Sequence, residues 1–173
     1  LTRENGVDIT IPETLENIAN DINHSIVLLL AAKTDVDGCE KDKGLLENGD
    51  AWKINVEGTA NVLHACKKGK KKIVYISTDF VFDGENPPID GYTEDSIPNP
   101  VNWYGTTKML GEDGVKELSS DFLIVRPEMP YSSNFDKKLD IARIFLKMLK
   151  EGKEINGVSD QKITPTFVDD IVH

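Results

Sequence analysis

The chain has 173 residues and a formal net charge of −10, so it is long enough to bury the core of one domain. Its negative charge argues against a nucleic-acid surface, and no run approaches the ~18 apolar residues of a membrane-spanning helix. The two cysteines form no C-x-x-C pair, and the three histidines have no ligand spacing. We therefore expect no disulfide framework and no metal site, with Cys66 in the core and Cys39 in a loop. The chain begins without a signal-peptide pattern, and we expect it in the reducing cytoplasm.

The first part of the chain alternates a short helix with an apolar run, as a parallel sheet with crossover helices requires. Residues 11–23 predict a helix with Thr10 as its N-cap and Glu13 completing a capping box. Residues 25–32 are almost continuously apolar, which is typical of a strand buried on both faces. Residues 35–42 indicate an acidic loop whose spacing fails the calcium-binding EF-hand pattern.

The central part predicts a long helix, a buried strand and a long loop. The helix covers residues 50–68, and the lysine-rich run 67–72 fits its C-terminus, with Gly69 as the C′ residue. Residues 73–77 predict the next buried strand. Residues 82–100 are rich in Pro, Gly and Asp, and this length indicates a functional loop rather than a simple connector.

The last part continues the alternation with a helix, a strand and a second helix. Their expected ranges are 102–118, 122–126 and 139–150, followed by a short strand over 154–158. The whole order predicts an α/β fold with a parallel sheet.

Tyr104 and Lys108 lie four residues apart in the predicted helix 102–118, so they share one helix face. An ammonium beside a phenol lowers the tyrosine pKa from about 10 toward neutrality, which allows proton exchange with an alcohol oxygen. Thr78 ends the buried strand before them, where ligands bind in open α/β sheets. These three residues predict an acid/base site for carbonyl reduction or alcohol oxidation. Ser77 is the alternative to Thr78 as the hydroxyl that polarises the reacting oxygen.

Several segments together resemble one known family. The central ones are 76–84 (ISTDFVFDG), 92–95 (YTED), 98–100 (PNP) and 104–112 (YGTTKMLGE). Upstream, segments 31–40 (AAKTDVDGCE) and 55–61 (NVEGTAN) fit the same order and spacing, and downstream Asp160, Gln161 and the segment 164–166 (TPT) fit again. Over residues 8–170 the chain resembles the dTDP-4-dehydrorhamnose reductases, which are extended short-chain dehydrogenase/reductases.

The resemblance implies an enzyme with a Rossmann-type doubly wound parallel sheet and a small C-terminal substrate-binding part. Residues 1–126 would be the NAD(P)-binding domain without its N-terminal Gly-rich unit. Residues 127–173 would be the start of the substrate-binding part, interleaved with the core. The implied reaction uses NADPH or NADH to reduce the 4-keto group of a nucleotide-activated deoxysugar, as in dTDP-rhamnose biosynthesis. A homodimer is one candidate assembly, with neither nucleic acid nor membrane as a partner.

The resemblance also assigns site residues in this sequence. The catalytic residues would be Thr78, Tyr104 and Lys108. Cofactor contacts would come from Asp8, Ile9, Ala31, Ala32, Lys33, Thr34 and Asn55, together with Tyr104 and Lys108. Substrate contacts would come from Thr78, Asp79 and Met129. From the sequence alone, the two alanines could instead serve tight strand-to-helix packing, and Asn55 could be a solvated helix residue.

Two departures from the family leave alternatives open. No G-x-x-G-x-x-G or G-x-G-x-x-G turn occurs in the sequence, although such a turn holds the cofactor pyrophosphate in this family. We expect the chain to be part of a longer protein; a natural loss of cofactor binding is the other explanation. Met129 stands where the family has a tryptophan, so the identity of the sugar is open. The rival functions are a nucleotide-sugar epimerase or dehydratase, and a non-catalytic regulatory subunit of the methionine adenosyltransferase β type.

Overall fold

A computed structural model of the chain describes residues 3–85, 87–132, 139–157, 159–160 and 162–171. It divides into two compact units, Leu1–Arg126 and Pro127–His173. Each unit is described by itself below.

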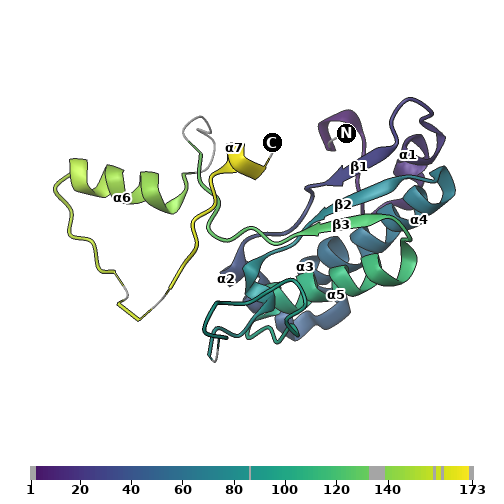
Figure 1. Ribbon diagram of the computed structural model, residues 1–173. Coiled ribbons are helices and arrows are strands. Elements are labelled where there is room, and N and C mark those ends of the chain that lie inside the picture. Colours follow the sequence, from purple (N-terminus) through teal and green to yellow (C-terminus); the bar gives the residue numbers. More distant parts are fainter. Residues whose placement is uncertain (1–2, 86, 133–138, 158, 161, 172–173) are drawn as a thin grey trace. The chain divides into compact units, whose positions relative to one another are not determined.

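The first unit is built around a parallel three-stranded sheet with the strand order β1-β2-β3 (Figure 1). The strands are β1 (Ile26–Leu29), β2 (Lys72–Ile76) and β3 (Phe122–Val125). Leu28 lies opposite Val74, which in turn lies opposite Leu123. The expected α/β class with a parallel sheet is confirmed.

Helical segments connect the strands of this unit. In chain order they are the 3-10 helices Arg3–Asn5 and Pro12–Leu15, α1 (Glu16–Asn20), α2 (Val36–Asp42), the 3-10 helix Lys43–Asn48, α3 (Asp50–Trp52), a π-helical segment Lys53–Gly58, α4 (Thr59–Gly69), the 3-10 helix Asp79–Val81 and α5 (Trp103–Leu118). The expected helix 50–68 therefore exists as one helical run with a π-helical middle. Single π turns inside helices often mark functional sites.

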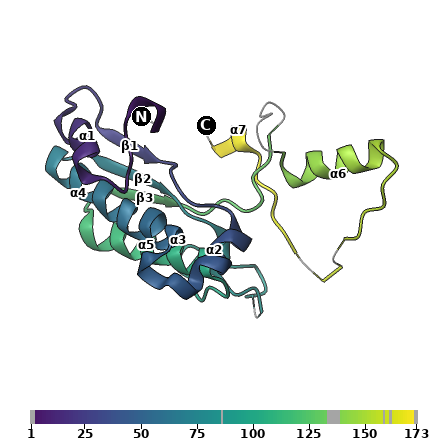
Figure 2. The same cartoon turned by 180° about the vertical axis from the view of Figure 1, so that it is seen from behind.

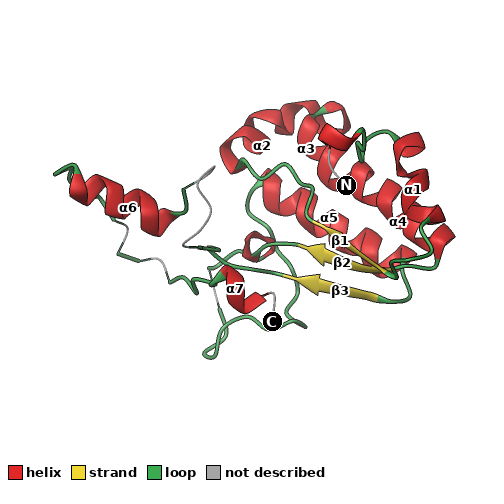
Figure 3. Ribbon diagram, turned by 90° about the horizontal axis from the view of Figure 1, so that it is seen from above, coloured by secondary structure: helices red, strands yellow, loops and turns green. Residues whose placement is uncertain are grey.

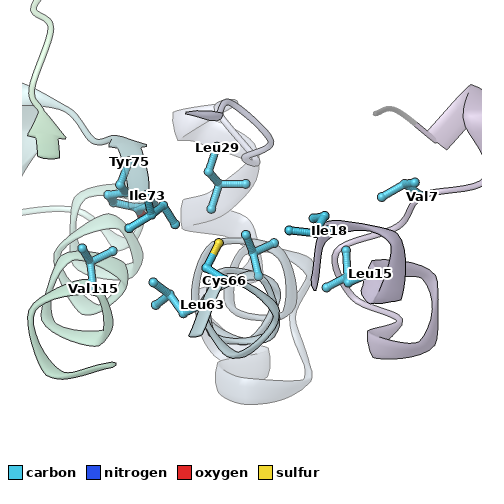
Figure 4. Close-up of a cluster of buried hydrophobic side chains, with 10 residues drawn as sticks. Val7, Leu15, Ile18, Leu29, Leu63, Cys66, Ile73, Tyr75 and Val115 are labelled. Atoms are coloured by element: carbon cyan, nitrogen blue, oxygen red, sulfur yellow. The ribbon is translucent and has the colours of Figure 1, made fainter. Parts of the chain in front are cut away.

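The main core lies between the sheet and the helices α1, α4 and α5 (Figure 4). Side chains from alternate strand positions meet those of the helices, because successive strand residues point to opposite faces. Leu29, Ile73 and Tyr75 point from the strands toward Leu63 and Cys66 of α4. Cys66 is buried as expected.

Helices α3, α4 and α5 of the first unit lie on one side of its sheet (Figures 2 and 3). The expected burial of residues 25–32 on both faces is wrong for this structure. Ile26, Leu28 and Leu30 alternate with the buried Leu29 and remain largely exposed. Leu123 of β3, which lies in register with Leu28 across Val74, is also exposed.

Two local expectations are corrected by side-chain contacts. Thr10 is no N-cap, because its hydroxyl donates to Asp8 Oδ1 at 2.7 Å. The acidic segment after Thr34 is helix α2, which Asp35 caps by accepting from the Gly38 amide at 3.1 Å.

Burial and backbone conformation give the remaining corrections. Cys39 is a buried residue of helix α2 rather than a loop thiol. The left-handed residue that ends α4 is Lys70, with φ of 53°, rather than Gly69. Gly69 serves close packing instead, because a Cβ there would lie 2.8 Å from Ala19 O. Residues 154–157 form no strand, and Val158 lies outside the described residues.

Glycine at position 111 is required by close packing against β2. A Cβ on Gly111 would lie 2.2 Å from the Tyr75 hydroxyl oxygen, whereas a Cβ on Gly114 meets Leu63 Cδ1 at an ordinary 3.7 Å. Both glycines are in α5, so helix propensity affects them alike.

We therefore expect Gly111→Ala to lower the free energy of unfolding by about 1–3 kcal/mol through overpacking. Gly114→Ala should raise it by up to about 1 kcal/mol, because alanine favours the helix. Urea unfolding of the intact protein measures both. Equal effects of the two substitutions would contradict the packing argument.

The second unit contains α6 (Ile141–Lys150) and α7 (Val168–Ile171). Tyr131 pairs with Phe167 in an isolated parallel bridge, and their rings lie 5.3 Å apart. Met129 has a left-handed backbone with φ of 42°. Its neighbour Glu128 bonds through its carbonyl to the Thr166 amide at 3.1 Å.

Candidate active site

The candidate site lies where the chain leaves the parallel strands of the first unit. Ala31 to Thr34 follow β1, and Thr78 follows β2. Parallel strands place their carboxyl ends at one edge of the sheet, which is the usual ligand-binding edge of open α/β folds. The first turn of α5 brings Tyr104 to the same edge, where it packs against Phe80 just after Thr78.

The start of α5 is fixed by two side chains that accept from its free amides. Asn102 Oδ1 accepts from Gly105 N at 2.7 Å, which is the N-cap geometry. Glu40 Oε2 of α2 accepts from Trp103 N at 2.8 Å. Tyr104 therefore sits on a helix end that is held from two directions.

Thr78 and Tyr104 bring their hydroxyl groups together. The Thr78 hydroxyl lies beside the Tyr104 phenol and acts to lower its pKa. Thr78 itself donates to Asp79 Oδ1 at 2.9 Å and accepts from Phe80 N at 3.2 Å. The Phe80 ring packs edge-on against the Tyr104 ring, with centroids 5.9 Å apart. Ser77, the alternative hydroxyl, is buried on the helix side of the sheet next to Glu112.

The pKa of Tyr104 is raised in this structure, whereas proximity to Lys108 was expected to lower it. Burial is the main cause, and the Thr78 hydroxyl opposes it. The nearby Asp79 and Cys39 raise the pKa of the phenol further. The expectation failed because a helix face puts two side chains close together without aiming one at the other.

Lys108 points into the protein. Only 2% of the residue is exposed, and its Nζ lies 4.0 Å from the centroid of the Tyr75 ring. Burial lowers the pKa of Lys108 to about 8, and the charge of Glu112 opposes this shift. Within the described residues the ammonium has no hydrogen-bond or ion-pair partner, which leaves its donors available to a ligand hydroxyl.

Asn55 is fully buried in the π-helical segment and joins two parts of the site. Its Oδ1 accepts from Lys33 N at 2.8 Å, and its Nδ2 donates to Lys33 O at 3.1 Å and to Thr107 Oγ1 at 3.0 Å. Thr107 in turn donates to Tyr104 O at 2.9 Å. The side chain thus links the segment after β1 to the helix that carries Tyr104, and the solvated alternative for Asn55 is wrong.

We expect Asn55→Ala to lower the free energy of unfolding by about 3 kcal/mol or more, because three polar partners lose their bonds and each buried one costs ~1–3 kcal/mol. Asn61→Ala is the matched control: Asn61 Nδ2 makes one bond, to Ile9 O at 2.9 Å. Its cost should be about 1 kcal/mol. Equal urea midpoints for the two variants would contradict the bridging role of Asn55.

The other residues implied as cofactor contacts lie around the same helical run. Asp8 uses its backbone and carboxylate to hold Thr10 and Thr14. Ile9 packs on Gly58, where a Cβ would lie 2.8 Å from Ile9 Cδ1. Ala31, Ala32 and Thr34 are at least partly exposed beside Lys33, whose Nζ lies 3.7 Å from Asp50 Oδ2. Met129 belongs to the second unit.

Sequence reasoning left out the pairing of Glu112 with Arg126. Glu112 ends the segment 104–112, and Arg126 ends the predicted strand 122–126. Arg126 donates from Nε and Nη2 to the two carboxylate oxygens of Glu112, at 2.8 and 2.6 Å. A glutamate four residues after Lys108 was the available signal, because that spacing repeats the face of Tyr104 and Lys108.

The described residues also bear on whether the chain offers a metal site or a membrane-spanning helix. They contain no cluster of His, Cys, Asp or Glu that could hold a metal ion. None of the helices in the described ranges is long and apolar enough to cross a membrane.

The chain is similar to known reductases along its whole length. The sequence profile of the RmlD substrate binding domain family matches residues 1–173. The dTDP-4-dehydrorhamnose reductase of Burkholderia thailandensis is 35% identical over 161 residues, which cover 92% of this chain and 50% of that protein. Methionine adenosyltransferase 2 subunit beta of Rattus norvegicus is 30% identical over 168 residues, covering 95% of this chain and 47% of that protein. The chain therefore spans about half the length of these curated relatives.

Among solved structures, the dTDP-4-dehydrorhamnose reductase of Bacillus anthracis in complex with NADP superposes with a TM-score of 0.83 at 37% identity. The match covers 95% of this chain and 55% of that one.

Proposed function

Because the chain belongs to the RmlD substrate binding domain family, we propose that the intact protein is an NAD(P)H-dependent reductase of a nucleotide-activated 4-keto deoxysugar. The observation that carries this proposal is the adjacency of the Thr78 hydroxyl and the Tyr104 phenol at the ligand-binding edge of the sheet. The family match supports the chemical class, and the adjacency of the two hydroxyl groups supports Tyr104 as the acid with Thr78 as its hydrogen-bonding neighbour.

We assign cofactor binding to the first unit, in the region of Ala31 to Thr34 and Lys108. The buried ammonium of Lys108 has no hydrogen-bond partner among the described residues, and it fits a hydroxyl of the nicotinamide ribose. When bound, the reduced nicotinamide supplies a hydride to the carbonyl carbon. The second unit would be the start of the substrate-binding part of the protein, with Met129 as its proposed contact with the substrate.

Tyr104 would act as the general acid. The phenol keeps its proton near neutral pH, so it has a proton to donate to the oxygen that gains negative charge during reduction. The Thr78 hydroxyl would hydrogen-bond to the same oxygen, and Asp79 would hold the Thr78 hydroxyl in place.

The test is a reductase assay of the intact protein with dTDP-4-dehydrorhamnose and either NADPH or NADH. We expect loss of the reduced-nicotinamide absorbance, and a product that gains two hydrogen atoms by mass spectrometry. Absence of oxidation with both cofactors would refute the proposal. The cofactor with the higher kcat/KM identifies the physiological donor.

A regulatory function is the second candidate, favoured by the similarity to methionine adenosyltransferase 2 subunit beta. It predicts binding to a methionine adenosyltransferase with a change in the kinetics of that enzyme. Substrate turnover in the reductase assay would decide for the enzyme, because the regulatory reading requires no reaction at Tyr104.

A further inference from the structure

A buried ion pair lies one helical turn beyond Lys108. Glu112 is 0% exposed, and the Arg126 side chain is 15% exposed. The two form a bidentate pair at 2.8 and 2.6 Å, a geometry that fixes both side chains. Burying such a pair costs desolvation energy that its attraction often fails to repay, so stability alone is a weak reason for it.

The surroundings of the pair keep Glu112 ionised. Burial raises the pKa of Glu112, but the hydrogen bonds from Arg126, the nearby Ser77 hydroxyl and the charges of Arg126 and Lys116 outweigh it, so the pKa is held below its usual value. Lys116 Nζ lies 3.6 Å from Glu112 Oε2 on the solvent side. The Ser77 oxygen has no hydrogen bond of good geometry within the described residues.

Arg126 is held from its other side as well. Its guanidinium lies 5.2 Å from the Phe82 ring centroid and donates to Glu94 O at 3.3 Å. The Glu112 carboxylate is therefore anchored to the loop that follows β2.

Lys108 shares a face of α5 with Glu112, four residues apart. The titratable groups that face the ammonium are Glu112 from its own helix and Tyr75 from β2. Burial raises the pKa of Tyr75, so its phenol is neutral near pH 7. Among the described residues, Glu112 is the one carboxylate whose charge acts on Lys108.

We infer that the Glu112–Arg126 pair is a positioning element of the active site, in which the anchored Glu112 carboxylate keeps the buried Lys108 in its ammonium form. Its kinetic consequence rests on the proposed function, because the ammonium matters there for ribose binding. Removing the carboxylate takes an opposite charge away from Lys108, which favours the neutral amine.

The direct test is a pH titration of Lys108 in the intact protein, followed by NMR of lysine labelled with carbon-13 at Cε. The signal is assigned by its absence in Lys108→Met. We expect a pKa of about 8 in the unchanged protein. Glu112→Gln should lower it by about one unit, the effect of losing a neighbouring opposite charge.

Two further variants keep the test decisive. Arg126→Met should raise the pKa of Lys108, because Glu112 then has Lys108 as its buried cation. Lys116→Met is the matched control on the same carboxylate: its side chain is 46% exposed, and solvent screens its charge, so the titration of Lys108 should stay unchanged. If Glu112→Gln fails to fold, the Arg126→Met result decides. A Lys108 pKa that moves in neither variant overturns the inference.

The pH–rate profile separates this inference from the proposed function. In an active reductase, the basic limb for Glu112→Gln should move to lower pH by the same amount as the NMR titration. At pH 8 this corresponds to a roughly fivefold loss of the ammonium form. A shifted titration without reductase activity would support the inference and refute the function. Reductase activity together with an unchanged titration of Lys108 would support the function and refute the inference.

Discussion

Tyr104→Phe is expected to lower kcat for sugar reduction by about 10²–10⁴-fold, the usual contribution of general acid catalysis. The substitution removes one hydroxyl and leaves the ring, so the edge-on packing against Phe80 is retained. The phenol is the group beside Thr78 that carries a transferable proton near neutral pH. Steady-state kinetics with saturating cofactor measures the effect, and circular dichroism checks the fold.

Tyr92→Phe is the matched control for this experiment. It also deletes one phenolic hydroxyl, which donates to Asp83 Oδ1 at 2.7 Å in the loop after β2. The stacking of its ring on Phe82 survives the change, and kcat should remain close to that of the unchanged protein. Near wild-type turnover of folded Tyr104→Phe would refute the catalytic assignment.

Lys108→Met should weaken NAD(P)H binding by about 10–100-fold, since a hydrogen bond to a charged group contributes ~1.5–3 kcal/mol. It should also change the pH dependence. The pKa of Lys108 is about 8, so the ammonium is present below that pH and is lost as pH rises through it. In the unchanged protein the rate should therefore fall above about pH 8. The variant lacks this limb, and its optimum moves to higher pH, where Tyr104 titrates.

Methionine preserves most of the side-chain volume and removes a buried charge, so the Lys108→Met variant should keep its stability. Lys116→Met makes the same change on the same helix at a half-exposed position. It should leave both cofactor affinity and the pH profile unchanged. Identical pH profiles for Lys108→Met and the unchanged protein would show that the buried lysine takes no part in the reaction.

The order of strands and helices followed from local patterns. Apolar runs and helical spacing predicted β2, β3 and α5 to within a residue or two, because hydrophobic periodicity reports which face is buried. The same patterns predicted a strand over residues 154–158, although residues 154–157 form none in the structure, and they missed α2. The start of α2 depends on a cap by Asp35, a residue that also suits a loop.

The sequence by itself determined that Tyr104 and Lys108 share one face of α5, and that Thr78 ends a strand, because these facts depend on helix and strand periods. The tertiary structure determined the pKa values of Tyr104 and Lys108. Burial raises the pKa of Tyr104 and lowers that of Lys108 to about 8. It also decided the partners: Asn55 meets Thr107 across 52 positions of sequence, and Glu112 meets Arg126 from beyond β3. A pKa depends on desolvation and on neighbours brought close by the fold, and neither is encoded in the spacing of residues along one helix.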